Sequence, residues 1–92
     1  MNNKNNPLLT TLKIIDFLSH CEGNTKELAE IFAIGTATLN RHIAEARSMG
    51  AKIESVKNKG HQHYRLTNAS EIMIRVLRWI DLEEKRDLIE RA

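Results

Sequence analysis

The chain has one cysteine, four aromatic residues and no long apolar run, and these shortages limit what kind of protein it can be. A single cysteine, Cys21, rules out an internal disulfide framework and fits a reducing compartment. No apolar run is long enough to cross a membrane, and the polar residues 1–7 do not resemble a signal peptide. We therefore expect a soluble, cytoplasmic protein with no membrane partner.

Residues with the chemistry of a catalytic or metal site are also scarce. Cys21 directly follows His20, but adjacent helical positions point apart, and the sequence offers neither an acidic partner nor an oxyanion device. His61 and His63 share one face of a predicted strand, yet no Cys, Asp or Glu close by completes a four-ligand zinc site. No glycine-rich phosphate loop is present. We predict that the protein is not an enzyme and holds no metal and no cofactor.

The chain of 92 residues, 41% hydrophobic, is long enough for one domain with a modest core of Leu, Ile and Ala. Helical spacing of apolar residues predicts a first helix over residues 8–20, which ends before Gly23. Asn24 is expected to cap a second helix over residues 25–32, because Glu27 three positions later completes a capping box. The residues of this second helix expected in the core are Leu28, Ile31 and Phe32.

A turn at residues 33–35 leads into a third predicted helix over residues 36–49, with Gly35 or Thr36 as its cap. Gly50 stops this helix, since a left-handed residue after a helix is usually glycine. The side chains of the third helix expected in the core are Leu39, Ile43 and Ala46.

An alternating pattern then predicts two short strands. The first covers residues 52–57 with Ile53 and Val56 as apolar anchors, and the second contains Tyr64 and Leu66. Asn58, Lys59 and Gly60 between them are typical turn residues. The sequence thus predicts a two-stranded hairpin with a basic tip.

A last helix is predicted over residues 71–91, capped by Asn68 or Ser70. Its apolar stripe consists of Ile72, Met73, Val76, Leu77, Ile80, Leu88 and Ile89. The predicted fold class is mainly α with a small two-stranded β-hairpin. We divide the chain into a disordered N-terminus (residues 1–7), a domain of three helices and the hairpin (8–67) and a C-terminal helix (68–92).

The net charge of +2 is unevenly distributed. Residues 36–66 contain six basic and two acidic residues, a net charge of +4, whereas residues 70–92 contain five basic and six acidic residues, a net charge of −1. The positive charge therefore gathers on the third helix and the hairpin, as polyanion binding requires.

A helix, a helix–turn–helix pair and a hairpin, in this order, are typical of a winged helix-turn-helix domain. The segments that carry this likeness are LKIIDFL (12–18), KELAEIF (26–32), TATLNRHI (36–43) and MGAKIESVKNKGHQHYRL (49–66). They resemble the N-terminal repressor domain of biotin–protein ligases and bacterial regulators of the DeoR-like and HTH-11 type. Gly35 stands where that family usually has serine, and no ligand-binding or catalytic domain follows, so control by a bound metabolite is not expected.

The winged-helix reading implies that the third helix enters the major groove of double-stranded DNA. With its core residues turned inward, helical spacing turns five polar residues outward: Thr36, Thr38, Asn40, Arg41 and Arg47. The two threonine hydroxyls suit phosphate oxygens or thymine methyl groups. Asn40 can pair with adenine, whereas Arg41 suits either guanine or a phosphate. His42, next to the buried Ile43, is expected to be partly buried and hydrogen-bonded rather than a ligand.

The hairpin is the wing, which in this fold usually touches the DNA backbone or the minor groove. The DNA-binding candidates on the wing, residues 57–65, are Lys57, Lys59 and His61. Lys59 sits at the tip and is the preferred phosphate contact; the alternative is that these charges only discourage strand pairing at the hairpin edge.

One domain of this size buries little DNA surface, so we expect a homodimer through the C-terminal helix. Its candidate interface residues are Leu88 and Ile89, which are hard to bury within so small a body, and Trp79, which lies partly off the apolar stripe. The predicted function is a sequence-specific transcriptional regulator, a repressor of the compact kind carried by phages or mobile elements. The alternatives are a winged-helix module that binds a protein partner of the polymerase, replication or defence machinery, and a replication or packaging accessory protein.

Overall fold

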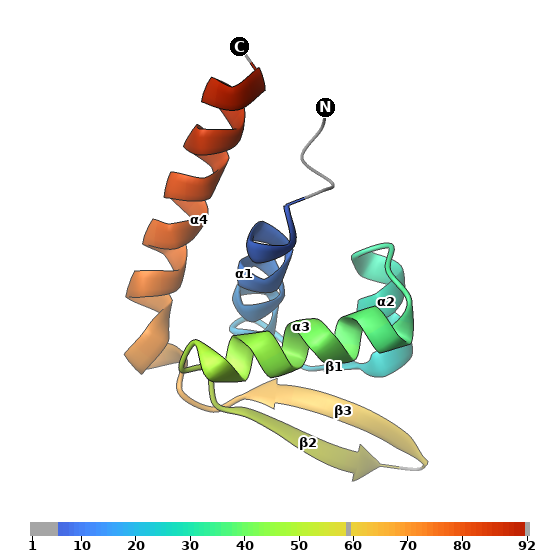
Figure 1. Ribbon diagram of the computed structural model, residues 1–92. Helices are drawn as coiled ribbons and strands as arrows, with labels where there is room; N and C mark the ends of the chain where they lie inside the picture. Colours follow the sequence, from blue (N-terminus) through green and yellow to red (C-terminus); the bar gives the residue numbers. More distant parts are fainter. Residues whose placement is uncertain (1–5, 59, 92) are drawn as a thin grey trace.

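The computed structural model describes residues 6–58 and 60–91, and over these residues it contains four helices and a small antiparallel sheet (Figure 1). The elements in chain order are α1 (Pro7–Leu18), β1 (Gly23–Asn24), α2 (Thr25–Ile31), α3 (Thr36–Ser48), β2 (Ile53–Asn58), β3 (His61–Leu66) and α4 (Ala69–Arg91). The predicted fold class of a winged helix with an additional C-terminal helix is confirmed, except for the number of strands.

The sheet has three strands in the order β1-β3-β2, not two. Strand β1 is only two residues long, and it pairs Gly23 with Tyr64 and Asn24 with His63. Gly23 allows this pairing because a Cβ atom on it would lie 3.1 Å from Cγ of the buried Leu28. The prediction of a two-stranded hairpin was wrong because so short a strand has no periodicity, and its partner lies some forty residues further along the chain.

The helix ends follow the capping rules. The Asn6 side chain accepts a hydrogen bond from the Leu9 N–H at 3.0 Å, which fixes the start of α1 at Pro7. Asn6 and Pro7 are thus the N-cap and the first residue of α1, whereas the sequence assigned them to the N-terminal segment 1–7; residues 1–5 lie outside the described part of the chain. The predicted capping box of α2 is confirmed, with Asn24 Oδ1 and Glu27 Oε1 each accepting the other residue's backbone N–H.

Helix α3 lies across one face of the β2–β3 hairpin, with α1 behind it (Figure 1). The core between these layers consists of aliphatic side chains and one aromatic ring: Leu12, Ile14, Ile15, Leu18, Leu28, Leu39, Ile43, Ala46, Ala51, Ile53, Tyr64, Leu66, Ile72 and Val76. Three residues predicted to be buried, Ile31, Val56 and Leu77, are instead exposed. Each lies on the outer side of its element, where no other element of the described residues covers it.

Helix α4 runs alongside α1, and the C-terminal half of α4 is bonded to α1 and to its N-cap (Figure 1). Asn6 Nδ2 donates to Glu83 and Asp87 at 3.2 Å each, and Lys13 pairs with Glu84 at 3.2 Å. At the other end of α4, the Asn68 side chain accepts from the Lys52 N–H and donates to the carbonyl of Gly50. These contacts fasten both ends of α4 to the body.

Candidate nucleic-acid interface

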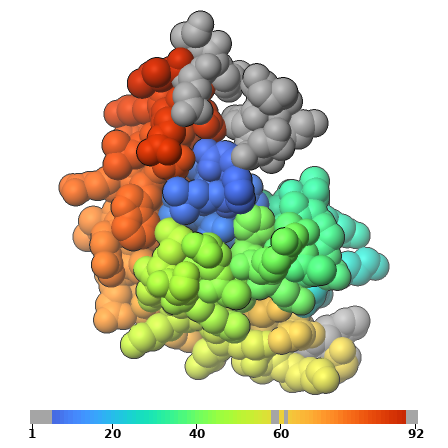
Figure 2. Space-filling model, in the orientation of Figure 1, coloured from blue at the N-terminus to red at the C-terminus, as the bar shows by residue number. Residues whose placement is uncertain are grey.

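Helix α3 is presented by a tight turn and a buried apolar stripe. The turn from α2 contains Ala33 at φ +56°, and the Ile34 N–H closes it on the carbonyl of Ala29. Gly35 then precedes α3 in an extended conformation, without a side-chain cap. Leu39, Ile43 and Ala46 are buried as predicted, which leaves the opposite side of α3 open to solvent. In Figure 2 this helix crosses the middle of the visible face, between α1 above and the hairpin below.

The solvent-facing side of α3 has a small set of residues. Arg41 lies at its centre, with the exposed Ala37 and Ala44 one turn before and after it and Ser48 one turn further on. The sequence analysis missed these three small residues, although their spacing of four, three and seven positions from Arg41, which places them on one side of a helix, was visible. Small side chains let a helix backbone come close to base edges, and an alanine methyl group suits the methyl group of thymine. We define Ala37, Arg41, Ala44 and Ser48 as the reading face.

Three predicted site residues, Thr36, Thr38 and Asn40, lie beside the reading face, and two of them are hydrogen-bonded. Thr36 is exposed, and Thr38 accepts a hydrogen bond from Arg41 Nη2 at 3.3 Å. On the sheet side, Tyr64 Oη donates to Asn40 Oδ1 at 2.9 Å. Tyr64 is 3% exposed, so a rigid residue fixes the orientation of the exposed Asn40 amide.

Arg47 lies on the sheet side of α3, not on the reading face. Its Nε and Nη2 both donate to the carbonyl of Ile53, at 3.1 and 2.8 Å. This forked contact joins the end of α3 to the start of β2. The guanidinium proposed from the sequence as a DNA contact thus has a structural role inside the domain.

On the side toward α1, His42 Nδ1 lies 2.7 Å from Thr11 Oγ1. The prediction that His42 is partly buried and hydrogen-bonded is confirmed. Burial and, to a smaller extent, the neighbouring Arg41 charge lower the pKa of His42 below 6.5, whereas Glu45 acts in the opposite direction. His42 is therefore neutral at pH 7.

The two faces of the wing differ in charge. Lys57 is exposed and pairs across the strands with Gln62, on the same sheet face as Tyr64, which contacts α3. Arg65 lies on the opposite face, where it forms ion pairs with Glu54 at 2.6 Å and Glu22 at 3.7 Å. Lys59, the expected phosphate contact, lies outside the described residues, as does the side chain of His61.

The candidate dimer residues fall into two groups. Trp79 is half-buried and packs against the core, so it is less available than expected. Leu88 and Ile89 are 63% and 75% exposed, as their positions beyond the body suggested. The sequence analysis missed Ile74 and Leu77, which are exposed on the same side of α4 as Leu88. We define Ile74, Leu77 and Leu88 as the α4 face.

Within residues 6–58 and 60–91, no cluster of three or more His, Cys, Asp or Glu side chains is arranged to hold a metal ion. Over the same residues, no helix has the length and apolar character needed to traverse a lipid bilayer. Cys21 is an exposed thiol just beyond the end of α1.

The family comparison agrees with this geometry. A family model described as an HTH domain, HTH_11, matches residues 10–62. The match runs from the first turns of α1 through α3 and β2 into β3, so it includes the reading face and most of the wing. No curated protein and no solved structure matches the chain. Since the matched segment is more than half of the 92 residues, the chain belongs to the HTH_11 family of helix-turn-helix domains, which bind DNA in transcription regulators and are typically not enzymes.

Proposed function

We propose that this protein is a sequence-specific transcriptional regulator that binds double-stranded DNA with α3 in the major groove and the wing on the backbone or minor groove. The observation that carries the proposal is the reading face, an exposed strip of small residues around a single arginine. An α-helix fits the major groove of B-DNA, and an arginine between alanines can approach it closely. The resemblance to a repressor domain supports repression as the mode of action.

The position of Lys57 supports the role of the wing. Lys57 lies on the sheet face that packs against α3, so its charge is on the same side of the molecule as Asn40. Arg65, on the other face, is already neutralised by two carboxylates. Phosphate binding by the wing therefore depends on Lys57 and on the tip.

The α4 face supports binding as a homodimer. Exposed apolar side chains on one side of a helix are a common surface for self-association, and two copies read two half-sites about one helical turn apart. We propose that Leu88 and Ile74 lie in this interface and that Trp79 remains with the core.

The test is selection from a random pool of duplex DNA by the full chain across a salt series, followed by sequencing of the bound fraction. Arg41→Ala should weaken binding at least tenfold. The matched control Arg75→Ala removes the same charge from an exposed position on α4 and should leave affinity within about twofold. Enrichment of an inverted repeat supports the dimer, and enrichment of one asymmetric site supports a monomeric regulator.

The exposed apolar residues of α4 also favour a second function, a winged-helix module that binds a protein partner. In that case duplex DNA would not be retained even at low salt. Substitutions on the α4 face would then abolish the function, whereas Arg41→Ala would leave it intact.

A further inference from the structure

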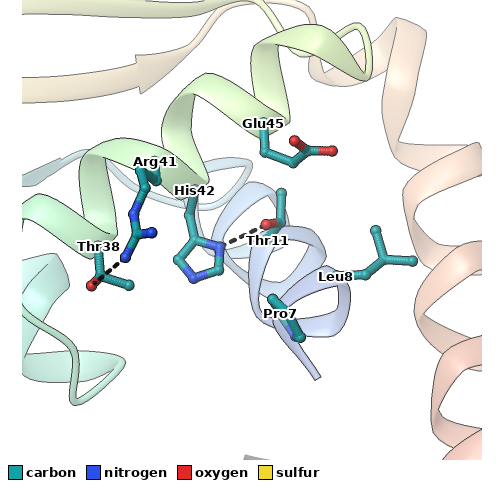
Figure 3. Close-up of a pocket in the computed structure, with 7 residues that line it drawn as sticks. All are labelled: Pro7, Leu8, Thr11, Thr38, Arg41, His42 and Glu45. Carbon is teal, nitrogen blue, oxygen red and sulfur yellow. Dashed lines mark hydrogen bonds between the residues drawn. The ribbon is translucent and has the colours of Figure 1, made fainter. Parts of the chain in front are cut away.

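Helices α1 and α3 enclose an open groove beside the reading face (Figure 3). Its volume is about 550 Å³, and its lining residues are Pro7, Leu8 and Thr11 from α1 and Thr38, Arg41, His42 and Glu45 from α3. Arg41 belongs both to this lining and to the centre of the reading face. DNA bound by α3 would therefore pass the mouth of the groove.

The geometry points to this groove as a site for a phosphate of the DNA backbone, held by the Arg41 guanidinium and by Nε2–H of His42. The inference rests on the proposed function. It also decides the role of Arg41, for which the sequence left guanine and phosphate open, in favour of phosphate.

The first observation is the direction of the Arg41 side chain. Its Nη2 donates to Thr38 Oγ1 at 3.3 Å, so the guanidinium lies along the groove side of α3, next to His42, and does not project straight away from the helix (Figure 3). A guanidinium has five N–H donors, and this contact uses one of them. The remaining donors form the fork that binds phosphate oxygens.

The second observation is the orientation of the His42 ring. Thr11 is 1% exposed, and its hydroxyl holds Nδ1 of His42 at 2.7 Å, so the ring is fixed from the α1 side. Nε2 then points away from Thr11 into the groove (Figure 3). Nε2 carries a proton both in imidazolium and in the neutral tautomer in which Thr11 donates to Nδ1, so in either form it can donate to an anion.

The charged residues around His42 predict opposite effects on phosphate binding. Arg41 and Glu45 face it from α3, and the α1 residues that line the groove, Pro7, Leu8 and Thr11, carry no charge. A phosphate placed between Arg41 and His42 would be attracted by both and repelled by the Glu45 carboxylate. Removing Glu45 should therefore have the opposite effect to removing Arg41.

Protonation provides a second signature. The pKa of His42 lies below 6.5 without ligand, and a bound phosphate would raise it, because an anion stabilises imidazolium. Binding then takes up protons, so the affinity for DNA rises as the pH falls through the raised pKa of the bound state. One proton gives at most a tenfold increase in affinity per pH unit.

The experiment measures fluorescence anisotropy of the full chain with a duplex between pH 5.5 and 8, with circular dichroism at each pH to confirm folding. We expect the rise in affinity at low pH to disappear in His42→Gln and to persist in the control His20→Gln, an exposed histidine at the far end of α1. Glu45→Gln should tighten binding severalfold. Arg41→Ala should lower the salt slope by about one, as expected for the loss of one phosphate contact.

Three outcomes would overturn the inference. If His42→Gln binds DNA with the same pH profile as the wild type, the groove is not a phosphate site, but the proposed function stands. A loss of specificity at one base pair in Arg41→Ala, with an unchanged salt slope, makes Arg41 a base contact. If inorganic phosphate shifts the His42 side-chain NMR signals but no duplex binds, the groove binds a free anion. The phosphate then does not belong to DNA, and the proposed function is wrong as well.

Discussion

Replacing Tyr64 with phenylalanine removes one hydroxyl group from the contact between the sheet and α3. The ring is buried and keeps its packing in the Tyr64→Phe variant, so no cavity forms. What is lost is the 2.9 Å hydrogen bond to Asn40 Oδ1. Water can take its place on Asn40, which is exposed.

The size of the effect follows from these contacts. A neutral intramolecular hydrogen bond contributes a net 0.5–1.5 kcal/mol, so the free energy of unfolding should fall by about 1 kcal/mol. For a domain of this size, that loss lowers Tm by about 4–8 °C. Asn40→Ala removes the other partner, and the two substitutions together form a double-mutant cycle. Urea unfolding of the four proteins should give a coupling energy of about 1 kcal/mol.

The same variant tests whether this bond matters for reading DNA. Tyr64 fixes the Asn40 amide before DNA arrives, which lowers the entropy cost of a directed contact. In Tyr64→Phe, selection from random DNA should show weaker preference at one base pair, with an unchanged salt slope because no phosphate contact is lost. A coupling energy near zero, or Tyr64→Phe as stable as the wild type, would refute the reasoning for the fold and for the site together.

Five further variants test other features of the structure. Arg47→Ala should lower the free energy of unfolding by about 1 kcal/mol through loss of the forked contact to the sheet, with an unchanged salt slope of DNA binding; a lower slope would restore Arg47 as a phosphate contact. Leu88→Asp and Ile74→Asp should each convert a dimer to a folded monomer in sedimentation at micromolar concentration, and an unchanged mass would exclude the α4 face. Gly50→Ala should lower the free energy of unfolding by about 1 kcal/mol in urea, because φ is +111°. The new Cβ would lie 3.7 Å from its nearest neighbour, so the cost comes from the backbone and not from a clash, and wild-type stability would show that the backbone relaxes. Because folding lowers the pKa of His42, the free energy of unfolding is highest above pH 6.5 and falls as the pH drops from 6.5 to the folded-state pKa. In thermal melts over this pH range, the Tm of His42→Gln should fall less than that of the wild type, and an equal fall in both proteins would contradict this.

The local signals in the sequence predicted most of the helices. The capping box at Asn24 and Glu27, the turn before Thr36 and the stop at Gly50 each depend on residues within a few positions of one another. Such signals act through backbone hydrogen bonds and allowed φ values, so they can be recognised without tertiary structure. The burial of the α3 stripe also follows from spacing alone.

Contacts between distant segments could not be predicted in the same way. Strand β1 exists because Gly23 lies beside Tyr64, and Ile31 is exposed because no other element in the described part of the chain lies over that side of α2. Arg47 looked like a free cation because its partner is a backbone carbonyl, that of Ile53, which has no sequence signature. For the candidate site residues, the sequence therefore predicted the helix on which they lie but not which of its polar side chains are bonded to other parts of the fold.

The hydrogen bonds that these side chains already make within the fold limit how the protein can recognise DNA. Asn40 and Arg47 tie α3 to the sheet and His42 ties it to α1, so the helix is held rigidly on both flanks. The surface that faces DNA consists of the reading face, with the exposed Asn40 beside it, and from Ala37 to Ser48 it extends about 16 Å at 1.5 Å per residue. This length matches roughly five base pairs at 3.4 Å each. Five base pairs recur far too often in a genome to specify one site. We therefore expect a second copy to bind in fixed register, and the α4 face is an exposed apolar surface that could hold the two copies together.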